Sequence, residues 1–420
     1  MALNRDAIGK KIGPLTKTYD WKDLVLYALG VGAGFDELDY TYEKNLKALP
    51  SFSIAAVFEF FGQAALASNL NLAGVLHGEQ ELIFHRPIPT AGTLTTEGQI
   101  THYYDKGPKG ALVVAESATA HSNGETLFTS ILTLFARLDG GFGGEAAPSR
   151  TITFPDREPD FCVAATPSPS QPLLYRLSGD IFPLHVDPEF ARMAGFDRPI
   201  MHGLCTHGFA CRALIASLIP GKPELARRLA CRFSKTLYPG DPIRTQIWKT
   251  GAGEALWRTV NVRTGETVID HGLFAYGERA EGAIRNAGRA AVANGVQTAE
   301  AEPAAPSEKA ARGTVASVES VFAKMPQVFR AEKAAGIHCT FQYTITGEGG
   351  GEWFAEVKDG TCRIETGKHL DPGCTLIIAA ADFLALMNGT LPALEAFTSG
   401  KLKIEGDLIK AQLIGKLFKM

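Results

Sequence analysis

Two stretches of the chain repeat the same order of apolar and polar positions. Pro50-Ser-Phe-Ser-Ile and Pro199-Ile-Met-His-Gly each open a long apolar run of helical character, and a strand-like segment follows 34 residues later, at Phe84 and at Phe233. A turn then leads into a second strand in both copies, and every landmark lies 149 residues from its counterpart. This pattern predicts, twice, one long helix laid against an antiparallel sheet.

A change in composition separates these repeats from the rest of the chain. Residues 281–312 are rich in Ala, Glu, Pro and Gly and hold almost no large apolar side chains, so we expect a flexible linker. Beyond it, helical apolar spacing over 315–325 is followed by alternating strands and a further apolar helix. We therefore expect an α+β chain with repeats at 1–150 and 151–280, a linker at 281–312, and an α/β domain at 313–420.

Composition limits the classes of function. A net charge of −3 and a pI near 6.4 give no broad basic field, so nucleic acid is not an expected partner. The most apolar stretch, 52–76, is broken by Glu59, Gln63 and three Asn, which argues against stable membrane insertion. The seven cysteines lack metal-ligand spacing, which favours reduced thiols in an intracellular compartment. No GxGxxG follows a predicted strand, so a nicotinamide cofactor is not expected.

Candidate chemistry gathers in the second copy, just before its helix. Asp180 and His185 lie five residues apart in a Pro-interrupted turn, and Gly203 precedes a helix predicted at 204–219. A carboxylate and a neutral imidazole can activate water together, and a helix start offers free N–H groups to a developing negative charge. The set suits addition of water beside a thioester carbonyl. Taken singly, each residue also has a structural interpretation, as a turn residue, a structural His or a steric Gly.

The first copy lacks this set. The positions 149 residues before Asp180, His185 and Gly203 hold Val31, Asp36 and Ile54. Duplication followed by loss of one site would leave the first copy free to accommodate a long acyl chain.

The segments Tyr175-Arg-Leu-Ser-Gly-Asp-Ile-Phe-Pro-Leu-His185 and 199–206 together resemble the hydratase 2 motif of (R)-specific enoyl-CoA hydratases, as found in multifunctional enzymes of type 2. The resemblance implies a MaoC-like double hot dog fold and hydration of trans-2-enoyl-CoA to (3R)-hydroxyacyl-CoA in fatty acid β-oxidation. Asp180 and His185 would be catalytic, Gly203 would donate to the oxyanion, and the coenzyme A thioester would be the substrate, with no cofactor or metal. One position departs from the motif, because Phe182 stands where the family usually has Asn.

Other segments resemble family segments that border the coenzyme A and acyl path, although each could equally be a solvated loop. They are Leu76-His-Gly-Glu-Gln80 and the Tyr104-Asp-Lys-Gly107 turn. Cationic side chains beside the second hot dog turn are candidates for binding the adenosine phosphates of coenzyme A. The resulting candidate substrate contacts are His77, Gly78, Asp105, Lys106, Gly107, His202, Arg232 and Lys235.

The last 108 residues resemble sterol carrier protein 2-type domains, which implies a bound fatty acyl-CoA or sterol-like lipid. Its apolar helix residues are then either ordinary core or the wall of a lipid tunnel. The resemblance also implies a peroxisomal location, although Phe418-Lys-Met420 is a poor version of the Ser-Lys-Leu address, and we expect a homodimer. The alternative function is a non-catalytic or weakly catalytic acyl-CoA and lipid carrier, in which Phe182 marks a degenerate hydratase site.

Overall fold

The computed structural model describes residues 3–148, 151–278, 317–334, 337–391, 396, 401–406 and 408–418. The linker expected at 281–312 lies outside these residues. The chain divides into two compact units, Met1–Glu278 and Arg279–Met420, and each is described by itself.

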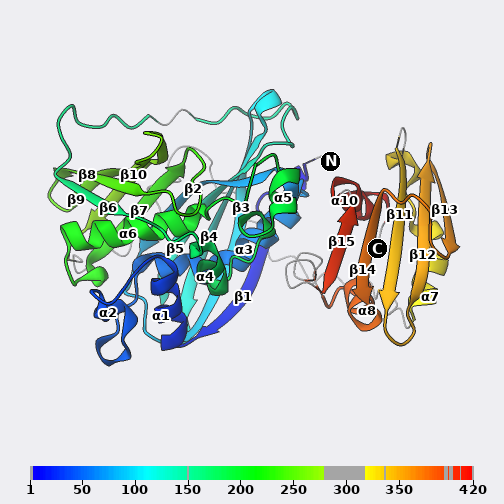
Figure 1. Ribbon diagram of the computed structural model, residues 1–420, viewed down its shortest axis with the longest axis horizontal. Helices are drawn as coiled ribbons and strands as arrows, with labels where there is room; N and C mark the ends of the chain where they lie inside the picture. Colours follow the sequence, from blue (N-terminus) through cyan, green and yellow to red (C-terminus); the bar gives the residue numbers. More distant parts are fainter. Residues whose placement is uncertain are drawn as a thin grey trace, which may run out of the picture. The chain divides into compact units, whose positions relative to one another are not determined.

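The first unit is built on one ten-stranded sheet in the order β1-β3-β4-β5-β2-β7-β10-β9-β8-β6 (Figure 1). All its neighbouring strands pair antiparallel. The strands of the first repeat are β1 (Lys11–Tyr19), β2 (Val75–Phe84), β3 (Gly92–Asp105), β4 (Ala111–His121) and β5 (Thr126–Ala136). Those of the second are β6 (Phe161–Ala165), β7 (Ala226–Phe233), β8 (Ile243–Gly251), β9 (Glu254–Asn261) and β10 (Thr267–Tyr276).

The two halves of the sheet mirror one another about its centre, which confirms the predicted repeat. At the centre, β2 pairs with β7, and Glu81 lies opposite Ala230, its counterpart 149 residues later. Each half then continues outwards through strands in the same relative order. Two helix-on-sheet units are thus joined edge to edge into one continuous sheet, the double hot dog arrangement expected from the motif.

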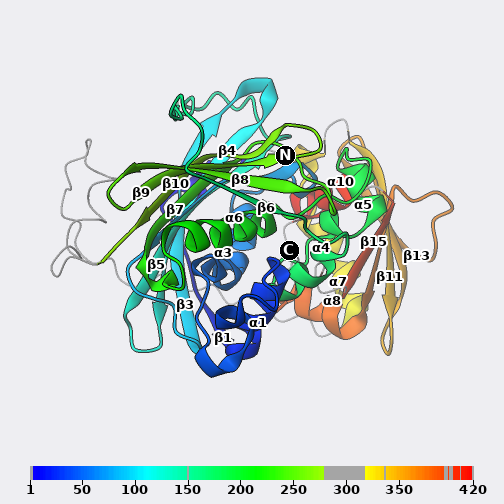
Figure 2. The same cartoon turned by 60° about the vertical axis from the view of Figure 1, so that its left-hand side comes forward.

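One long helix in each repeat packs against the sheet, α3 (Ser53–Ala67) and α6 (Gly203–Leu218), and both lie near the middle of the unit in Figure 2. The segment Pro50–Ala67 is long and apolar enough to cross a membrane, but 67% of it is buried inside the fold. Burial of that extent is typical of a core helix. The two helices therefore supply the apolar faces that the sheet covers.

In each repeat, shorter helices come between the first strand and the long helix along the chain. In the first repeat, α1 (Trp21–Gly30) begins at a capping box formed by Asp20 and Asp23 and is followed by α2 (Leu38–Thr41). In the second, α4 (Gln171–Tyr175) and α5 (Pro188–Met193) flank the segment that carries Asp180 and His185. Helices α1 and α4 pack together.

The second unit is an α/β domain with a five-stranded sheet in the order β13-β12-β11-β14-β15. β11 (His338–Thr346) pairs antiparallel with β12 (Gly351–Lys358) and parallel with β14 (Cys374–Ala379), and β13 (Thr361–Thr366) and β15 (Leu402–Gly406) form the edges. Its helices are α7 (Val318–Lys324), α8 (Ala380–Met387) and α10 (Leu408–Leu417). Of the helix expected over 315–325, the described part begins at Val318, after the N-cap Ser317, and Met325 starts a 3-10 turn.

The core of this domain is aromatic. The ring of Phe322 stacks on Trp353 and on Phe383, with centroid distances of 4.5 and 5.6 Å. Of the apolar helix residues singled out in the sequence, Phe383, Leu417 and Phe418 are buried in this core, and Leu384, Leu386, Met387 and Leu413 pack half-buried against it. Phe418, the first residue of the C-terminal tripeptide, contacts the ring of Phe329 inside the fold.

Candidate active site

The loop that carries Asp180 begins with a turn at a glycine and buries the carboxyl group. Gly179 has φ +130°, a conformation that favours glycine, and turns the chain after the 3-10 turn Arg176–Ser178. The carboxylate of Asp180 accepts a hydrogen bond from the backbone N–H of Phe182 at 3.4 Å. Asp180 is only 9% exposed, and this burial raises its pKa to about 7, against the opposing effects of the Phe182 hydrogen bond and the Arg176 charge. The carboxyl group therefore titrates near neutral pH.

His185 ends a 3-10 turn, Pro183–His185, whose first residue has the fixed φ of proline. Its Nδ1 lies 3.0 Å from the carbonyl oxygen of Ile200, and a carbonyl can only accept, so Nδ1 carries the proton and Nε2 keeps its lone pair. Burial lowers the pKa of His185 to about 4, so the ring is neutral at pH 7. A neutral imidazole with a free Nε2 can accept a hydrogen bond from water.

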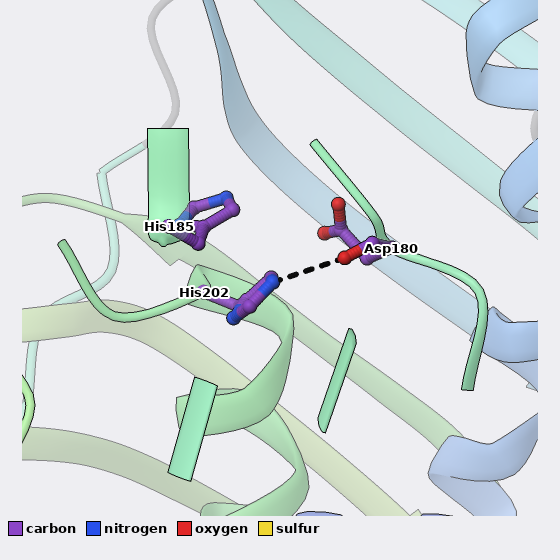
Figure 3. Close-up of side chains that lie close together, drawn as sticks. All are labelled: Asp180, His185 and His202. Atoms are coloured by element: carbon purple, nitrogen blue, oxygen red, sulfur yellow. Dashed lines mark hydrogen bonds between the residues drawn. The ribbon is translucent and has the colours of Figure 1, made fainter. Parts of the chain in front are cut away.

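Asp180 and His185 lie close together, with His202 beside them (Figure 3). The rings of His185 and His202 stack with centroids 3.8 Å apart and an interplanar angle of 27°. The Nε2 of His202 donates to the backbone carbonyl of Asp180 at 3.1 Å. Burial lowers the pKa of His202 well below its ordinary value, so the site combines two neutral rings with one carboxyl group.

Gly203 is the first residue of α6, directly after His202. The first N–H groups of a helix have no partner within the helix, and the helix dipole adds positive potential there. A Cβ added to Gly203 would lie 3.0 Å from Cδ1 of Phe233, so a side chain at this position would press on that ring. The structure thus brings Asp180, His185 and Gly203 together through His202, and their catalytic roles stay a prediction.

Three of the candidate substrate contacts, His77, Gly78 and Lys106, lie beside aromatic rings. His77 packs edge-on against Phe233, with centroids 5.0 Å apart, and therefore lies near the start of α6. Gly78 faces Phe135, since a Cβ there would lie 3.5 Å from Cβ of Phe135, and the ammonium of Lys106 lies 5.9 Å from the centroid of the same ring. The two family-like segments thus meet at Phe135.

Asp105 organises a loop. Its carboxylate accepts hydrogen bonds from the backbone N–H groups of Gly107, Gly141 and Gly143 at 2.7 to 2.8 Å. These bonds, with that of Gly141 the largest, lower the pKa of the carboxyl group. Gly107 has φ +60°, which a turn at this place requires.

The cations proposed for the adenosine phosphates have acidic partners. Arg232 forms a salt bridge with Glu79 at 2.6 Å, across the β7–β2 pairing. Lys235 lies 3.7 Å from the carboxylate of Glu266, and both side chains are well exposed. These two side chains are therefore not isolated positive charges, although the Lys235 pair is open to solvent and weak.

Among the described residues, Asp180, His185 and His202 form a set that could hold a metal ion by distance, with one ligand atom from each within 4.8 Å of the others. The Nε2 of His202 donates toward the Asp180 carbonyl, and Nδ1 of His185 toward the Ile200 carbonyl, so each ring keeps one nitrogen lone pair. The expectation of a metal-free site remains a prediction.

The ring of Phe182, the residue out of pattern with the family, packs against another aromatic ring. The ring packs edge-on against Phe190 of α5, with centroids 5.1 Å apart, and Phe190 is buried. Three contacts that shape the site could not be predicted from the sequence: the Ile200 carbonyl with His185, Phe233 with Gly203, and Phe190 with Phe182. Such contacts depend on how distant segments fold together.

Three families of known proteins match the chain in order. Residues 18–138 match the MFE-2 hydratase 2 N-terminal domain, residues 150–272 the MaoC like domain, and residues 322–419 the SCP-2 sterol transfer family. A crystal structure of a MaoC-like dehydratase from Phytophthora capsici superposes with a TM-score of 0.57 at 33% identity, covering 66% of this chain and all of that one.

Two curated relatives are similar over long stretches. The chain is 36% identical to "Probable enoyl-CoA hydratase 2" of Dictyostelium discoideum, over 64% of this chain and 95% of that protein. It is 30% identical to "Peroxisomal multifunctional enzyme type 2" of Mus musculus over 98% of this chain, but spans only 55% of the mouse protein. The fold, the order of domains and these relatives show that the chain belongs to the hydratase 2 family of MaoC-like double hot dog proteins, here followed by an SCP-2 domain.

Proposed function

We propose that this protein is an (R)-specific 2-enoyl-CoA hydratase, a hydro-lyase that adds water to trans-2-enoyl-CoA to give (3R)-hydroxyacyl-CoA. The observation that carries the proposal is that the buried Asp180 and the half-buried His185 lie close together near the start of α6, where Gly203 has its backbone N–H. The names of the relatives support it, since they include an enoyl-CoA hydratase 2 and a multifunctional enzyme type 2.

The pair is suited to holding and activating one water molecule. The free Nε2 of His185 accepts a hydrogen bond from the water, and the Asp180 carboxylate accepts the other. With a pKa near 7, against about 4 for His185, Asp180 is the stronger base of the two. As the water oxygen bonds to C3 of the enoyl group, its proton passes to Asp180, which then delivers a proton to C2. The water is thereby divided between C3 and C2.

Negative charge builds on the thioester oxygen between these two proton transfers. The N–H of Gly203, at the positive end of α6, is placed to donate to that oxygen. The donor is fixed in advance because it belongs to the backbone of a buried helix. A preorganised donor of this kind stabilises the enolate-like oxygen more than the ground-state carbonyl.

The remaining parts of the chain receive roles from the family. The first repeat lacks the acid/base pair and accommodates the acyl chain, while His77, Gly78 and Lys106 border the path of the substrate. The SCP-2 domain binds a fatty acyl-CoA or sterol-like lipid. The peroxisomal names of two relatives support a peroxisomal location. In this proposal the protein acts in β-oxidation, as a homodimer.

The test is a hydration assay with the purified full chain and a short trans-2-enoyl-CoA. Enoyl absorbance should fall, and chiral analysis should give the 3R product. Absence of turnover, or a 3S product, would contradict the proposal; absence of turnover together with acyl-CoA binding would favour the alternative, a carrier with a degenerate site.

A further inference from the structure

His202 contacts Asp180 and His185 and precedes Gly203 directly in the chain. Its Nε2 donates to the carbonyl of Asp180, its ring stacks on His185, and its carbonyl carbon bonds to the nitrogen of Gly203. It is completely buried, and it ends the segment that leads into α6.

From this juxtaposition we infer that His202 is a positioning residue that fixes the Asp180 loop through its Nε2–H and keeps His185 neutral by covering its ring. The inference rests on the proposed function for the reaction that Asp180 and His185 perform. It assigns two separate tasks to two parts of one side chain. The N–H sets where the carboxylate lies, and the ring sets the orientation and charge of His185.

The hydrogen bond explains the first task. Asp180 follows Gly179, whose φ of +130° gives the loop no support from regular structure. The 3.1 Å bond from His202 ties the Asp180 backbone to the start of α6, where Gly203 lies. Positions of the carboxylate and of the oxyanion donor are thus coupled through a single residue. Misplacement of either by about 1 Å would cost substantial rate.

The stacked ring explains the second task. A 3.8 Å stack leaves no room for water between the rings, so one face of His185 is kept from solvent. His202 has no hydrogen-bond partner at Nδ1, and a second imidazolium beside His185 would be strongly disfavoured. If His185 became charged, it would form an ion pair with Asp180, which would stabilise the ionised carboxylate and weaken it as a base.

Other ionisable groups around the pair do not replace this effect. The positive charge of Arg176 lowers the pKa of Asp180 and of His202, and so favours the less protonated form of each. Tyr175, from α4, and Cys205, from α6, lie near Asp180 and are buried and neutral. A substitution of His202 that removes the stacked ring therefore tests how much this ring contributes to keeping His185 neutral.

The test separates the two tasks with two substitutions in the full chain. His202→Phe keeps a ring beneath His185 but loses the donor, while His202→Gln keeps a donor at the height of Nε2 but loses the ring. His207→Gln is the matched control, since His207 is also completely buried and lies in α6, within two turns of His202. The measurements are the kcat and KM of hydration and a ¹⁵N-histidine NMR titration of His185, identified with His185→Gln.

We expect kcat to fall about tenfold in each His202 variant, with KM changed by less than about threefold, because positioning acts mainly in the transition state. The pKa of His185 should rise toward its ordinary value in His202→Gln and stay low in His202→Phe and His207→Gln. A His185 titration that is the same in all proteins, or a kcat unaffected by both His202 substitutions, would overturn the inference. The NMR titration requires no turnover, so a wild-type chain without hydratase activity would contradict the proposed function and leave this result readable.

Discussion

Each hot dog repeat has one long helix and contributes five strands to the common sheet, but the two repeats differ in the segment that precedes the long helix. In the first repeat, the counterparts of Asp180 and Gly203 are the buried apolar residues Val31, directly after α1, and Ile54. In the second repeat, α4 and the 3-10 turn Arg176–Ser178 take the place of α1, and the chain then turns at Gly179 and Pro183. Both copies thus leave a helical stretch at the same point, but only the second has a carboxylate and an imidazole in the loop that follows. The same scaffold is therefore equipped for catalysis in one copy only.

The largest expected effect tests which copy holds the catalytic pair. Asp180→Ala or His185→Ala should lower kcat at least ~100-fold, because each removes a group that transfers or holds a proton. Asp36→Ala is the matched control, since Asp36 is the exposed counterpart of His185 in the first repeat. Steady-state hydration kinetics measure all three, and a control as damaged as the catalytic variants would abolish the distinction between the copies.

A smaller effect should follow at the one motif position that departs from the family. Phe182→Asn should raise kcat about tenfold, because an amide can donate to and accept from the attacking water, and a phenyl ring can do neither. The ring removed is the one that packs against Phe190. Hydration kinetics on the full chain check this. A fall in kcat instead would mean that the water position is built around Phe182.

Stability should reveal the buried carboxyl group of the second repeat. A carboxyl pKa raised from 3.8 to about 7 means that the folded chain holds this proton more tightly than the unfolded chain. The associated stability is present below pH 4 and is lost as the pH rises to about 7. Asp180→Asn, which cannot ionise, should therefore be more stable than wild type at pH 8 by on the order of 3 kcal/mol, or roughly 6–12 °C in Tm.

Thermal melts at pH 4 and pH 8 measure this difference. The advantage of Asp180→Asn should be confined to the higher pH, and Asp36→Asn in the first repeat should show no such dependence, because its side chain is exposed. An advantage of equal size at both pH values would place its origin in packing rather than in ionisation.

Separation of the two units should change hydration only slightly. Residues 1–280 produced alone should retain turnover within about threefold, because the two units have separate cores. Residues 313–420 produced alone should fold and bind a fluorescent fatty acyl-CoA. Failure of 1–280 to fold would show that the repeats depend on the SCP-2 domain.

The smallest effect is expected from metal removal. Incubation with EDTA should leave hydration unchanged, since the proposed reaction needs only a carboxyl group, a neutral imidazole and a backbone N–H. Metal analysis of the purified protein provides the companion measurement. Loss of activity that added metal restores would assign Asp180, His185 and His202 to a metal site.

Much of this arrangement could be predicted from the sequence because it depends on local pattern. Helical spacing and the 149-residue repeat predicted the double helix-on-sheet fold, and the order of Asp180, His185 and Gly203 predicted the residues at the centre of the site. Charge pairing could not be read in the same way. Arg232 was predicted as a cation for the substrate, but its partner Glu79 lies 153 positions away and meets it only through the pairing of β2 with β7. The stacking of His202 on His185 likewise exists only once the loop lies over the helix start.

The seam between β2 and β7 also indicates how small a working protein of this type could be. Because Glu81 and Ala230 are counterparts, the seam is in effect a strand paired with its own copy. A polypeptide limited to 151–278 would expose the backbone edge of β7, and two such polypeptides could hydrogen-bond there with Ala230 opposite Ala230. That symmetric assembly would contain two reactive loops instead of one. The fused chain exchanges this second reactive loop for a half of different sequence, which is free to diversify without loss of the first.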